Sequence, residues 1–586
     1  MNADRRLRQG EFPARQILLA SLAVCAIMLV TAASRLLTGK FPDPDDVLRL
    51  VQVRDLLAGQ GWFDVTQYRI DPPSGTAMHW TRVVDIPIAL LIAAFTPLLG
   101  QPGAEKFALV FIPFATFMVS AFAIGSLAWR LLGVRVAIIS VLACGFLPAL
   151  LFQFQPMRID HHGWQVAMVA ITLWAISRRN ARINGWTAGL AMATGLSISL
   201  EILPMAAAFA LVLFARWWFD HKQRGWLAAY MQALSLGLAG LYLATRGTSL
   251  TAYCDAVSPA HVAFFLVAGL GTTLIAQLTR LRGFGMLLLF ALVGGAAFSA
   301  YALLSPTCIA TPFATLDPLV EEYWYRLVFE GQPLWKQAPS VYVPALLQML
   351  AAMGAAAALY MRSDLWLRAW WAEYLFLLVA SVALGMLVAR SLAFASIIAA
   401  IPLGWLTSSL LARIRQQGAP LAAIGNAIAI ILLLAPMTLV LAARAILPPE
   451  PAAVEGVASG ACDVYANAPL LGGLEQGTVM APLDLGPAIL LETDHAVVAT
   501  GHHRANEAMA EVIRTFLASP DEARVLLSGS GADYLALCTE MTEIQLYANV
   551  APDGLAARLR GGEAPDWLER VELGGPPQLA VYRIAD

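Results

Sequence analysis

The chain has 586 residues, of which 59% are hydrophobic and 13% are charged, and its formal net charge is -2. Soluble proteins carry roughly 25% charged residues, so this composition excludes an ordinary soluble protein, and the near-neutral charge excludes a general nucleic-acid binder. Repeated apolar runs of roughly 20 residues predict a polytopic α-helical membrane protein, because a bilayer-spanning helix needs about that length.

Clusters of Lys and Arg set the predicted topology, because cytoplasmic loops concentrate basic residues. If all of these clusters lie in the cytoplasm, the apolar runs between them must come in pairs. This condition predicts about 13 spanning helices, a cytoplasmic N-terminus and an external C-terminus. The predicted spans cover about residues 16–36, 105–128, 134–154, 163–178, 185–199, 201–218, 225–244, 259–279, 284–304, 342–361, 369–388, 391–411 and 420–446.

The apolar run at 86–99 does not fit this pairing. It is short for a span and contains Pro87 and Pro97, and a crossing here would place the next basic cluster outside. We therefore predict a helix that lies in the outer membrane interface.

The remaining sequence divides into a membrane domain at 1–446, with outer loops at about 37–104 and 305–341, and an external domain at 447–586. The external part is rich in Gly, Asp and Glu. Short apolar runs such as "AILLE" and "YLALC" alternate there with helical stretches, which predicts a small α/β domain.

Four of the six cysteines fall on the external side of this topology. An oxidising exterior permits disulfides, and Cys462 with Cys538 is the favoured pair because both belong to the external domain. The alternative is that they are buried free thiols. Cys254 and Cys308 are also on the predicted external side, whereas Cys25 and Cys144 fall within predicted helices.

The first outer loop opens with three acidic residues. Asp43, Asp45 and Asp46 stand before a predicted amphipathic helix at 47–57. Acidic residues at a helix start can cap it and complement its dipole. The alternative is a divalent-cation site, because hard cations prefer clustered carboxylate oxygens.

A second polar group, "DHH", stands directly before the apolar run at 163–178. If the backbone is extended there, Asp160 and His162 face a common point and His161 points away. A structural residue at the membrane boundary is the ordinary interpretation. Because the group lies on the same predicted side as Asp43, it also favours a shared metal site.

Taken in order, these motifs resemble the catalytic subunit of oligosaccharyltransferase and its GT-C glycosyltransferase relatives. Members carry Asp-Pro followed by an Arg six residues after the Asp, a second acidic motif that is Asp-His-His in archaeal forms, and a Glu followed by x-Gln-Pro in the fifth outer loop. They also have thirteen helices and an external C-terminal domain. The matching residues here are Asp43, Pro44 and Arg49; Asp160, His161 and His162; and Glu330, Gln332 and Pro333.

The resemblance implies transfer of a sugar or oligosaccharide from a polyprenyl-phosphate or polyprenyl-pyrophosphate donor on the external face. Asp43, Asp160 and His162 would hold or orient a divalent metal, Mn²⁺ or Mg²⁺, with the imidazole slightly favouring Mn²⁺. Asp43 is the candidate general base. Glu330 would orient the acceptor or complete the metal shell, although its ordinary interpretation is a solvated loop acid.

Arg390 is the candidate donor-phosphate ligand, because relatives carry a similarly placed Arg and the planar guanidinium suits phosphate. Its alternative is a side chain that merely reaches the membrane surface.

The acceptor half of the resemblance is altered. Relatives carry Trp-Trp-Asp-Tyr-Gly in the external domain, where this chain keeps Asp484 and Gly486 but has Pro482 and Leu483 for the tryptophans. This departure argues against recognition of an Asn-x-Ser/Thr sequon. Further candidate contacts to the acceptor or donor are Arg49, Asp484, His502, His503 and Arg504. The ordinary interpretation of residues 502–504 is a solvated turn.

Three alternatives remain. The first is a GT-C transferase that adds a single sugar to an envelope lipid or polysaccharide. The second is a transporter of lipid-linked sugars, for which inverted repeats and polar residues at the bilayer midplane would be expected. The third is a non-catalytic scaffold, which would not need all of the external carboxylates. For the transferase, the predicted location is the bacterial inner membrane with a periplasmic C-terminal domain.

Overall fold

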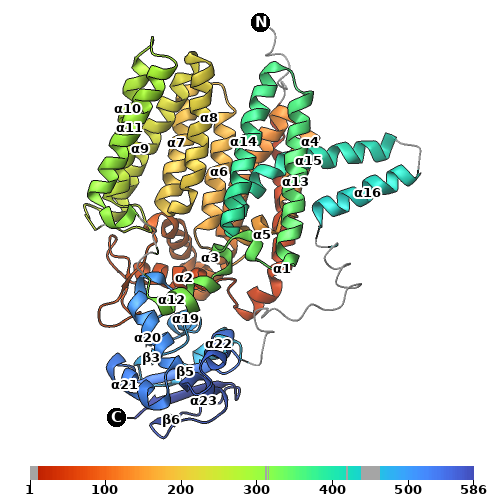
Figure 1. Cartoon of the computed structure of the whole chain (residues 1–586). Coiled ribbons are helices and arrows are strands. Elements are labelled where there is room, and N and C mark those ends of the chain that lie inside the picture. The colour runs from red at the N-terminus through yellow and green to blue at the C-terminus, as the bar shows by residue number, and fades with distance from the viewer. Residues whose placement is uncertain are drawn as a thin grey trace.

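A computed structural model describes residues 11–251, 253–309, 313, 316–416, 420–436, 438 and 462–585. Long helices form the upper part of the molecule, and a mixed α/β domain formed by the C-terminal residues lies below them (Figure 1). A layer that contains helix α2 (Pro44–Leu57) and helix α12 (Pro318–Tyr323) lies between the two parts. The protein is thus a polytopic helical membrane protein with an α/β domain at its C-terminal end.

Nine helices in the described part of the chain are long and apolar enough to cross a membrane, or ten if one bent pair counts as a span. The predicted spans 163–178, 185–199 and 420–446 correspond to helices outside those nine, namely α6, α7 and α16, and most of 435–446 lies outside the described residues. The helices are α1 (Ala14–Thr38), α3 (Arg82–Leu132), α4 (Val134–Cys144), α5 (Pro148–Phe154), α6 (His162–Ile176), α7 (Ala181–Ile198), α8 (Leu203–Phe219), α9 (Arg224–Arg246), α10 (Pro259–Gln277), α11 (Phe284–Leu304), α13 (Pro339–Arg362), α14 (Leu365–Leu387), α15 (Leu392–Gln416) and α16 (Pro420–Leu434).

Two helices are interrupted. Within α3, Gly100 has φ 68° and ψ 164°, a non-helical conformation that separates the predicted interfacial helix 86–99 from the span that follows it. The span predicted at 134–154 is wrong as a single helix, because α4 and α5 are bent by 74° at the intervening break. Pro148 begins α5 and has no backbone N–H to continue the preceding ladder.

Small residues bring the membrane helices together. A Cβ atom on Gly189 of α7 would overlap the carbonyl oxygen of Tyr230 on α9, and one on Gly404 of α15 would overlap the Ser140 side chain on α4. Close backbone approach of this kind is typical of membrane helix packing.

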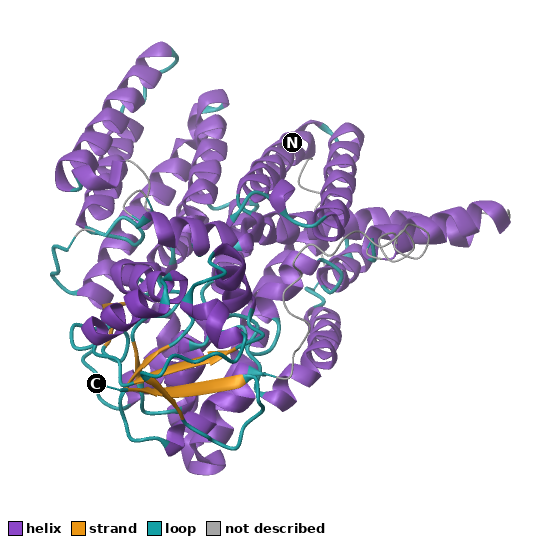
Figure 2. Ribbon diagram, turned by 60° about the horizontal axis from the view of Figure 1, so that its bottom comes forward, coloured by secondary structure: helices purple, strands orange, loops and turns teal. Residues whose placement is uncertain are grey.

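The C-terminal domain has a five-stranded sheet in the order β4-β3-β5-β7-β6, surrounded by helices (Figure 2). β3 pairs in parallel with β4 and β5, and β7 pairs antiparallel with β5 and β6. The prediction of an α/β domain is therefore confirmed. Its elements are α18 (Val464–Asn467), β3 (Thr478–Met480), α19 (Gly486–Glu492), β4 (Ala496–Val497), α20 (Asn506–Leu517), α21 (Pro520–Ser530), β5 (Tyr534–Cys538), α22 (Thr542–Val550), α23 (Leu555–Arg560), β6 (Leu568–Arg570) and β7 (Leu579–Ile584).

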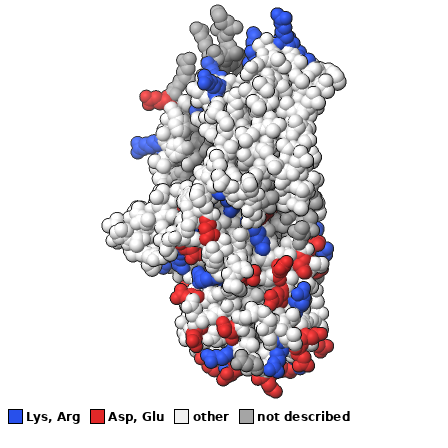
Figure 3. All heavy atoms as spheres, turned by 90° about the vertical axis from the view of Figure 1, so that its left-hand side faces the viewer, with Lys and Arg blue, Asp and Glu red and all other residues white. Residues whose placement is uncertain are grey.

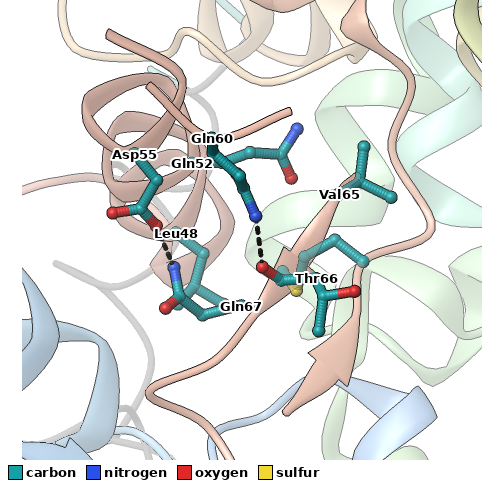
Figure 4. Close-up of a pocket in the computed structure, with 8 residues that line it drawn as sticks. Leu48, Gln52, Asp55, Gln60, Val65, Thr66 and Gln67 are labelled. Carbon is teal, nitrogen blue, oxygen red and sulfur yellow. Dashed lines mark hydrogen bonds between the residues drawn. The ribbon is translucent and has the colours of Figure 1, made fainter. Parts of the chain in front are cut away.

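The first outer loop and the external domain share one hydrophobic core. Val47 and Trp80 from the loop belong to the same buried cluster as Val479 and Leu490 from the domain. The loop also contains a short hairpin, β1 (Thr66–Gln67) and β2 (Thr76–Ala77), and a small pocket between this hairpin and α2 is lined by Gln60 and Gln67 among others (Figure 4). The shared core fixes the C-terminal domain against the first loop, at one end of the helical part of the molecule.

Two disulfides tie the external segments. Cys462 pairs with Cys538, as predicted, and Cys254 pairs with Cys308 across a separation of 54 residues. Cys25 and Cys144 are buried free thiols.

The surface separates by charge along the long axis of the molecule. Most of the upper part is uncharged, with Lys and Arg gathered at its upper end, whereas charges of both signs crowd the lower part (Figure 3). The uncharged region has the character of a lipid-facing surface.

Candidate active site

The start of α2 carries the first of the predicted residues. Asp43 is the N-cap of α2, and its Oδ1 accepts a hydrogen bond from the N–H of Asp45 at 2.9 Å. The capping interpretation of this acid is thus correct. Its other oxygen, Oδ2, lies 2.7 Å from Nη1 of Arg158, so the same carboxylate also takes part in a charged network.

Asp46, in the first turn of α2, contacts the "DHH" segment. Its side chain is fully buried, accepts the N–H of Asp160 at 2.8 Å and lies 3.1 Å from Arg158. Burial raises the pKa of Asp46 to about 7, with the neighbouring Asp43 and Asp160 adding to the shift and Arg158 opposing it. Asp46 therefore holds the "DHH" segment against the start of α2.

A buried guanidinium supports Asp160. Arg49 is 1% exposed and lies 3.1 Å from Oδ1 of Asp160 and 3.0 Å from Asp85, with its guanidinium over the Trp80 ring. Burial opposes ionisation of Asp160, but the imidazole of His161 and the guanidinium of Arg49 hold its pKa well below the ordinary value. Arg49 is thus placed beneath the site, where it keeps this carboxylate charged.

The backbone at His161 differs from the prediction. His161 has φ -74° and ψ -23° as the residue before α6, so the segment is helical here and not extended. The His161 and His162 rings consequently stack with centroids 4.0 Å apart, and Nδ1 of His161 lies 2.7 Å from Oδ1 of Asp160. The prediction that His161 points away is wrong, because successive side chains are rotated by about 100° in a helix and by about 180° in an extended strand.

Glu330 and Arg390 complete the network. Nη1 of Arg390 lies 3.2 Å from Oε1 of Glu330, and its Nη2 pairs with Glu201. Glu201 in turn lies 3.5 Å from Nε2 of His162. Contacts through Arg158 and Glu201 therefore connect every residue predicted for the metal, the donor phosphate and catalysis.

The donor set fits a divalent cation. Nδ1 of His162 lies 3.3 Å from Oδ2 of Asp160, and its Nε2 lies 3.5 Å from Glu201; these atoms of Asp160 and His162 are buried, and neither contact has the geometry of a hydrogen bond. One ligand atom each from Asp160, His161 and His162 lie within 4.8 Å of one another. Buried polar atoms normally find hydrogen-bond partners, and carboxylate with imidazole is a set that suits Mn²⁺ or Zn²⁺. Among the described residues, the group close enough to share an ion is Asp160, His161 and His162, whereas the two oxygens of Asp43, the third ligand predicted from the sequence, contact Asp45 and Arg158.

A second histidine cluster adjoins the first. His79 lies between β2 and α3, with its ring centroid 6.3 Å from that of His161, and its Nδ1 lies 2.9 Å from Nε2 of His502. Burial and neighbouring charges hold the pKa of His79 and His502 well below the ordinary value. The candidate contacts His502 and His503 therefore belong to a cluster centred on His79 and not to a solvated turn.

Two other predicted residues lie in the external domain. Arg504 makes a two-pronged contact with Asp255 at 2.8 and 2.9 Å, which leaves its guanidinium engaged. Asp484 is exposed as a residue, yet desolvation and the charge of Asp43 raise the pKa of its carboxyl. The backbone N–H of Asp484 donates to Glu543 at 3.2 Å, which fixes the start of α19 against α22.

Sequence reasoning did not assign Arg158, Glu201, Asp85 and His79 to the site. Glu201 offered a signal, since an ionisable residue inside an apolar stretch, "SISLEILPMA", is a default functional candidate. Glu201 lies in the short turn Leu200–Ile202 before α8, and its partners Arg390 and His162 come from distant segments. Arg158 offered no comparable signal, because its partners come from segments 112 to 172 residues away in the chain.

Comparison with known proteins identifies the fold. No protein-family model and no curated protein matches the sequence. Among solved structures, the oligosaccharyltransferase AglB from Archaeoglobus fulgidus, in complex with an inhibitory peptide and a dolichol-phosphate, superimposes with a TM-score of 0.66 over 98% of this chain and 75% of that chain, at 14% identity. The chain shares the fold of this GT-C membrane glycosyltransferase.

Two further structures of the same enzyme agree. One is tethered to an acceptor peptide containing an NVT sequon and gives a TM-score of 0.65 over 98% of this chain and 74% of that one, at 12% identity. The other is a complex with Zn and sulfate and gives a TM-score of 0.61 over 97% and 73%, at 13% identity. At these identities the likeness establishes the fold, and the chemistry must be argued from the residues described above.

Proposed function

We propose that the protein is a metal-assisted membrane glycosyltransferase that moves a sugar or oligosaccharide from a polyprenyl-phosphate or polyprenyl-pyrophosphate donor to an acceptor on the external face. The observation that carries this proposal is the meeting of Asp43, Asp160, His162, Glu330 and Arg390 at the outer ends of the helices. These residues come from four separate segments, and a scaffold has no need of such a convergence.

Arg390 is suited to the donor phosphate. Its guanidinium is 22% exposed, stands at the start of the α15 segment and now pairs with the carboxylates of Glu201 and Glu330. A phosphate can replace one of these partners without leaving the cation unpaired, and a bidentate contact to phosphate is among the stronger charged interactions. Arg390 would thereby fix the leaving group beside His162 and Asp160.

The carboxylates divide the remaining tasks. A divalent metal would neutralise the charge that develops on the leaving phosphate. Asp43 would accept the acceptor proton, and its exposure supports this role: its side chain is 17% exposed, whereas that of Asp160 is fully buried. Glu330, 28% exposed, would orient the acceptor from the loop opposite. Arg49 and Asp46 hold these groups in position from beneath.

The neighbouring structures support the donor class. One is complexed with dolichol-phosphate and another is tethered to an acceptor peptide, and we infer a polyprenyl-linked donor for this chain from that likeness. The acceptor is left open between a protein, a lipid and a polysaccharide, because Pro482 and Leu483 stand where relatives have the two tryptophans. A single-sugar transfer to an envelope lipid or polysaccharide is therefore the second candidate.

The topology completes the proposal. We infer about 13 spans. Nine described helices are long and apolar enough to cross a membrane, and α6, α7, α16 and the bent pair α4–α5 would supply the other four. The basic side chains at the upper end of the molecule (Figure 3) would be cytoplasmic, and the external domain periplasmic in a bacterial inner membrane.

The test uses the purified full-length protein and a deletion strain together. The deletion strain should accumulate a lipid-linked sugar and lose one class of envelope glycan, and comparison of its glycoproteins, glycolipids and polysaccharides names the acceptor. Purified protein should consume the accumulated donor, stop when a chelator is added and recover with Mn²⁺ or Mg²⁺. Accumulation of donor on the cytoplasmic leaflet alone, with no consumption by purified protein, would instead identify a transporter.

A further inference from the structure

We propose that His79, His502 and His503 form a second metal site, for Zn²⁺, that fastens the external domain to the first outer loop. This site is distinct from the one containing Asp160 and His162. The three rings lie with every pair of centroids 5.1 Å apart, and one nitrogen from each ring falls within 4.8 Å of the others.

The nitrogen positions approach those of a zinc site. Nδ1 of His79 and Nε2 of His502 are 2.9 Å apart, whereas Zn–N bonds of about 2.0–2.1 Å in a tetrahedral ion place two ligand nitrogens about 3.3 Å apart. The bound ion would open this contact by a few tenths of an ångström and replace the single proton that the two rings now share. His502 is 2% exposed, so its Nε2 would meet the ion away from bulk water.

Asp255 fixes the third ring as a carboxylate does beside a metal-bound histidine. Nε2 of His503 lies 2.6 Å from Oδ2 of Asp255, so the Nε2–H donates to the carboxylate and Nδ1 keeps the free lone pair. Histidine ligands to metals characteristically donate their second nitrogen to a carboxylate in this way. Asp255 adjoins the disulfide-bonded Cys254, which holds this partner in place.

The two neighbouring guanidinium groups are held by carboxylate and carbonyl oxygens, so they are not positioned to bind an anion among the three rings. Arg504 is bound to Asp255 on both prongs and also donates to the carbonyl oxygens of Ala77 and Met78. Arg246 donates to the carbonyl oxygens of His79 and Trp80. With both guanidinium groups occupied, the functional groups left facing one another are imidazoles, which are ligands typical of Zn²⁺.

The site would join three segments that are far apart in the sequence. His79 belongs to the first outer loop, Asp255 to the segment between α9 and α10, and His502 and His503 to the external domain. An ion bound only by the assembled segments adds its binding free energy to their association. Its role would be to hold the external domain over the candidate active site.

Metal counting on full-length protein tests this site without reference to activity. Wild type and three single variants, His79→Gln, His502→Gln and His221→Gln, are saturated with Zn²⁺, freed of excess by gel filtration and analysed by inductively coupled plasma mass spectrometry. Relative to wild type, His79→Gln and His502→Gln should each lose one equivalent. His221→Gln, the matched control on the segment before α9, should lose none.

Two further measurements separate this site from the proposed catalytic one. Co²⁺ in place of Zn²⁺ should give the visible absorption of a tetrahedral histidine site, which Asp160→Asn should retain and His79→Gln should lose. Chelation should increase hydrogen exchange at residues 499–506 in wild type. An unchanged Zn²⁺ count in both His79→Gln and His502→Gln would overturn the proposal. If one of these variants misfolds, the other still tests the site, because His79 lies in the first outer loop and His502 in the external domain.

Discussion

Nη1 of Arg390 lies 3.2 Å from Oε1 of Glu330, and the same guanidinium also pairs with Glu201. One cation therefore bridges the outer loop before α13 and the turn before α8. An anionic donor that binds Arg390 must displace part of this arrangement, so the two carboxylates set how readily the donor phosphate is accepted.

Replacing Arg390 should weaken donor use more than folding. Arg390→Ala removes a charged contact to phosphate that is worth about 1.5–3 kcal/mol, so kcat/KM for the lipid donor should fall about 10- to 150-fold. Arg390→Lys should recover only part of this loss, because an ammonium cannot make the bidentate contact. Arg368→Ala on α14 is the control, and unchanged kinetics in Arg390→Ala would remove this residue from the donor site.

Glu330→Gln should act in two directions. The substitution removes the negative charge of residue 330, so one carboxylate no longer competes with the donor phosphate for Arg390. The KM for the donor should therefore fall by several-fold. The kcat should fall as well if Glu330 orients the acceptor or completes the metal shell. Steady-state kinetics with varied donor separate the two effects, and a raised KM with normal kcat contradicts both assignments.

The metal ligands should give a graded series. Asp43→Ala and Asp160→Ala should nearly abolish transfer, whereas His162→Asp should retain activity and shift the preference from Mn²⁺ toward Mg²⁺, because it replaces imidazole with a harder oxygen ligand. His161→Ala should also reduce activity, because His161 contacts Asp160 directly. Donor consumption across a metal series measures all four, with Asp55→Asn on α2 as the control, and wild-type rates in both aspartate variants would refute the site.

Cysteine alkylation tests the fold independently of activity. Denatured protein that has not been reduced should label at Cys25 and Cys144 only, and at all six cysteines after reduction. Cys254→Ser should destabilise the chain by about 4 kcal/mol, since it opens a bridge across 54 residues. Mass spectrometry that finds Cys462 or Cys538 labelled without reductant would contradict the second bridge.

The external domain should lose stability as the pH rises toward neutrality. Desolvation and the charge of Asp484 raise the pKa of Glu543 from 4.5 to about 7, so the folded chain keeps a proton that the unfolded chain releases between these values. The stabilising effect is complete below pH 4.5 and lost above pH 7. Thermal unfolding from pH 5 to 8 should show a falling Tm in wild type and a flatter profile in Glu543→Gln, and identical profiles would exclude this group as the cause.

The sequence by itself determined the elements whose cause is local. Apolar runs of membrane length, the acidic cap at the start of α2 and the alternating composition of the last 140 residues or so all depend on neighbouring residues or on the solvent, so the sequence alone predicts them. The bend between α4 and α5 was not predicted, although Pro148 lies at it. The resemblance of the ordered motifs then placed Asp43, Asp160, His162, Glu330 and Arg390 in one site, and the structure does bring them together.

Only the tertiary structure decided the partners of these residues. Arg158 lies between Asp43, Asp46 and Glu330, and His79 meets His502 across 423 residues of sequence. Neither pairing follows from spacing, because it arises when the outer loop and the external domain bury a common core. Even the orientation of His161 depended on where α6 begins: His161 has helical φ and ψ angles, and its Nδ1 lies 2.7 Å from Oδ1 of Asp160.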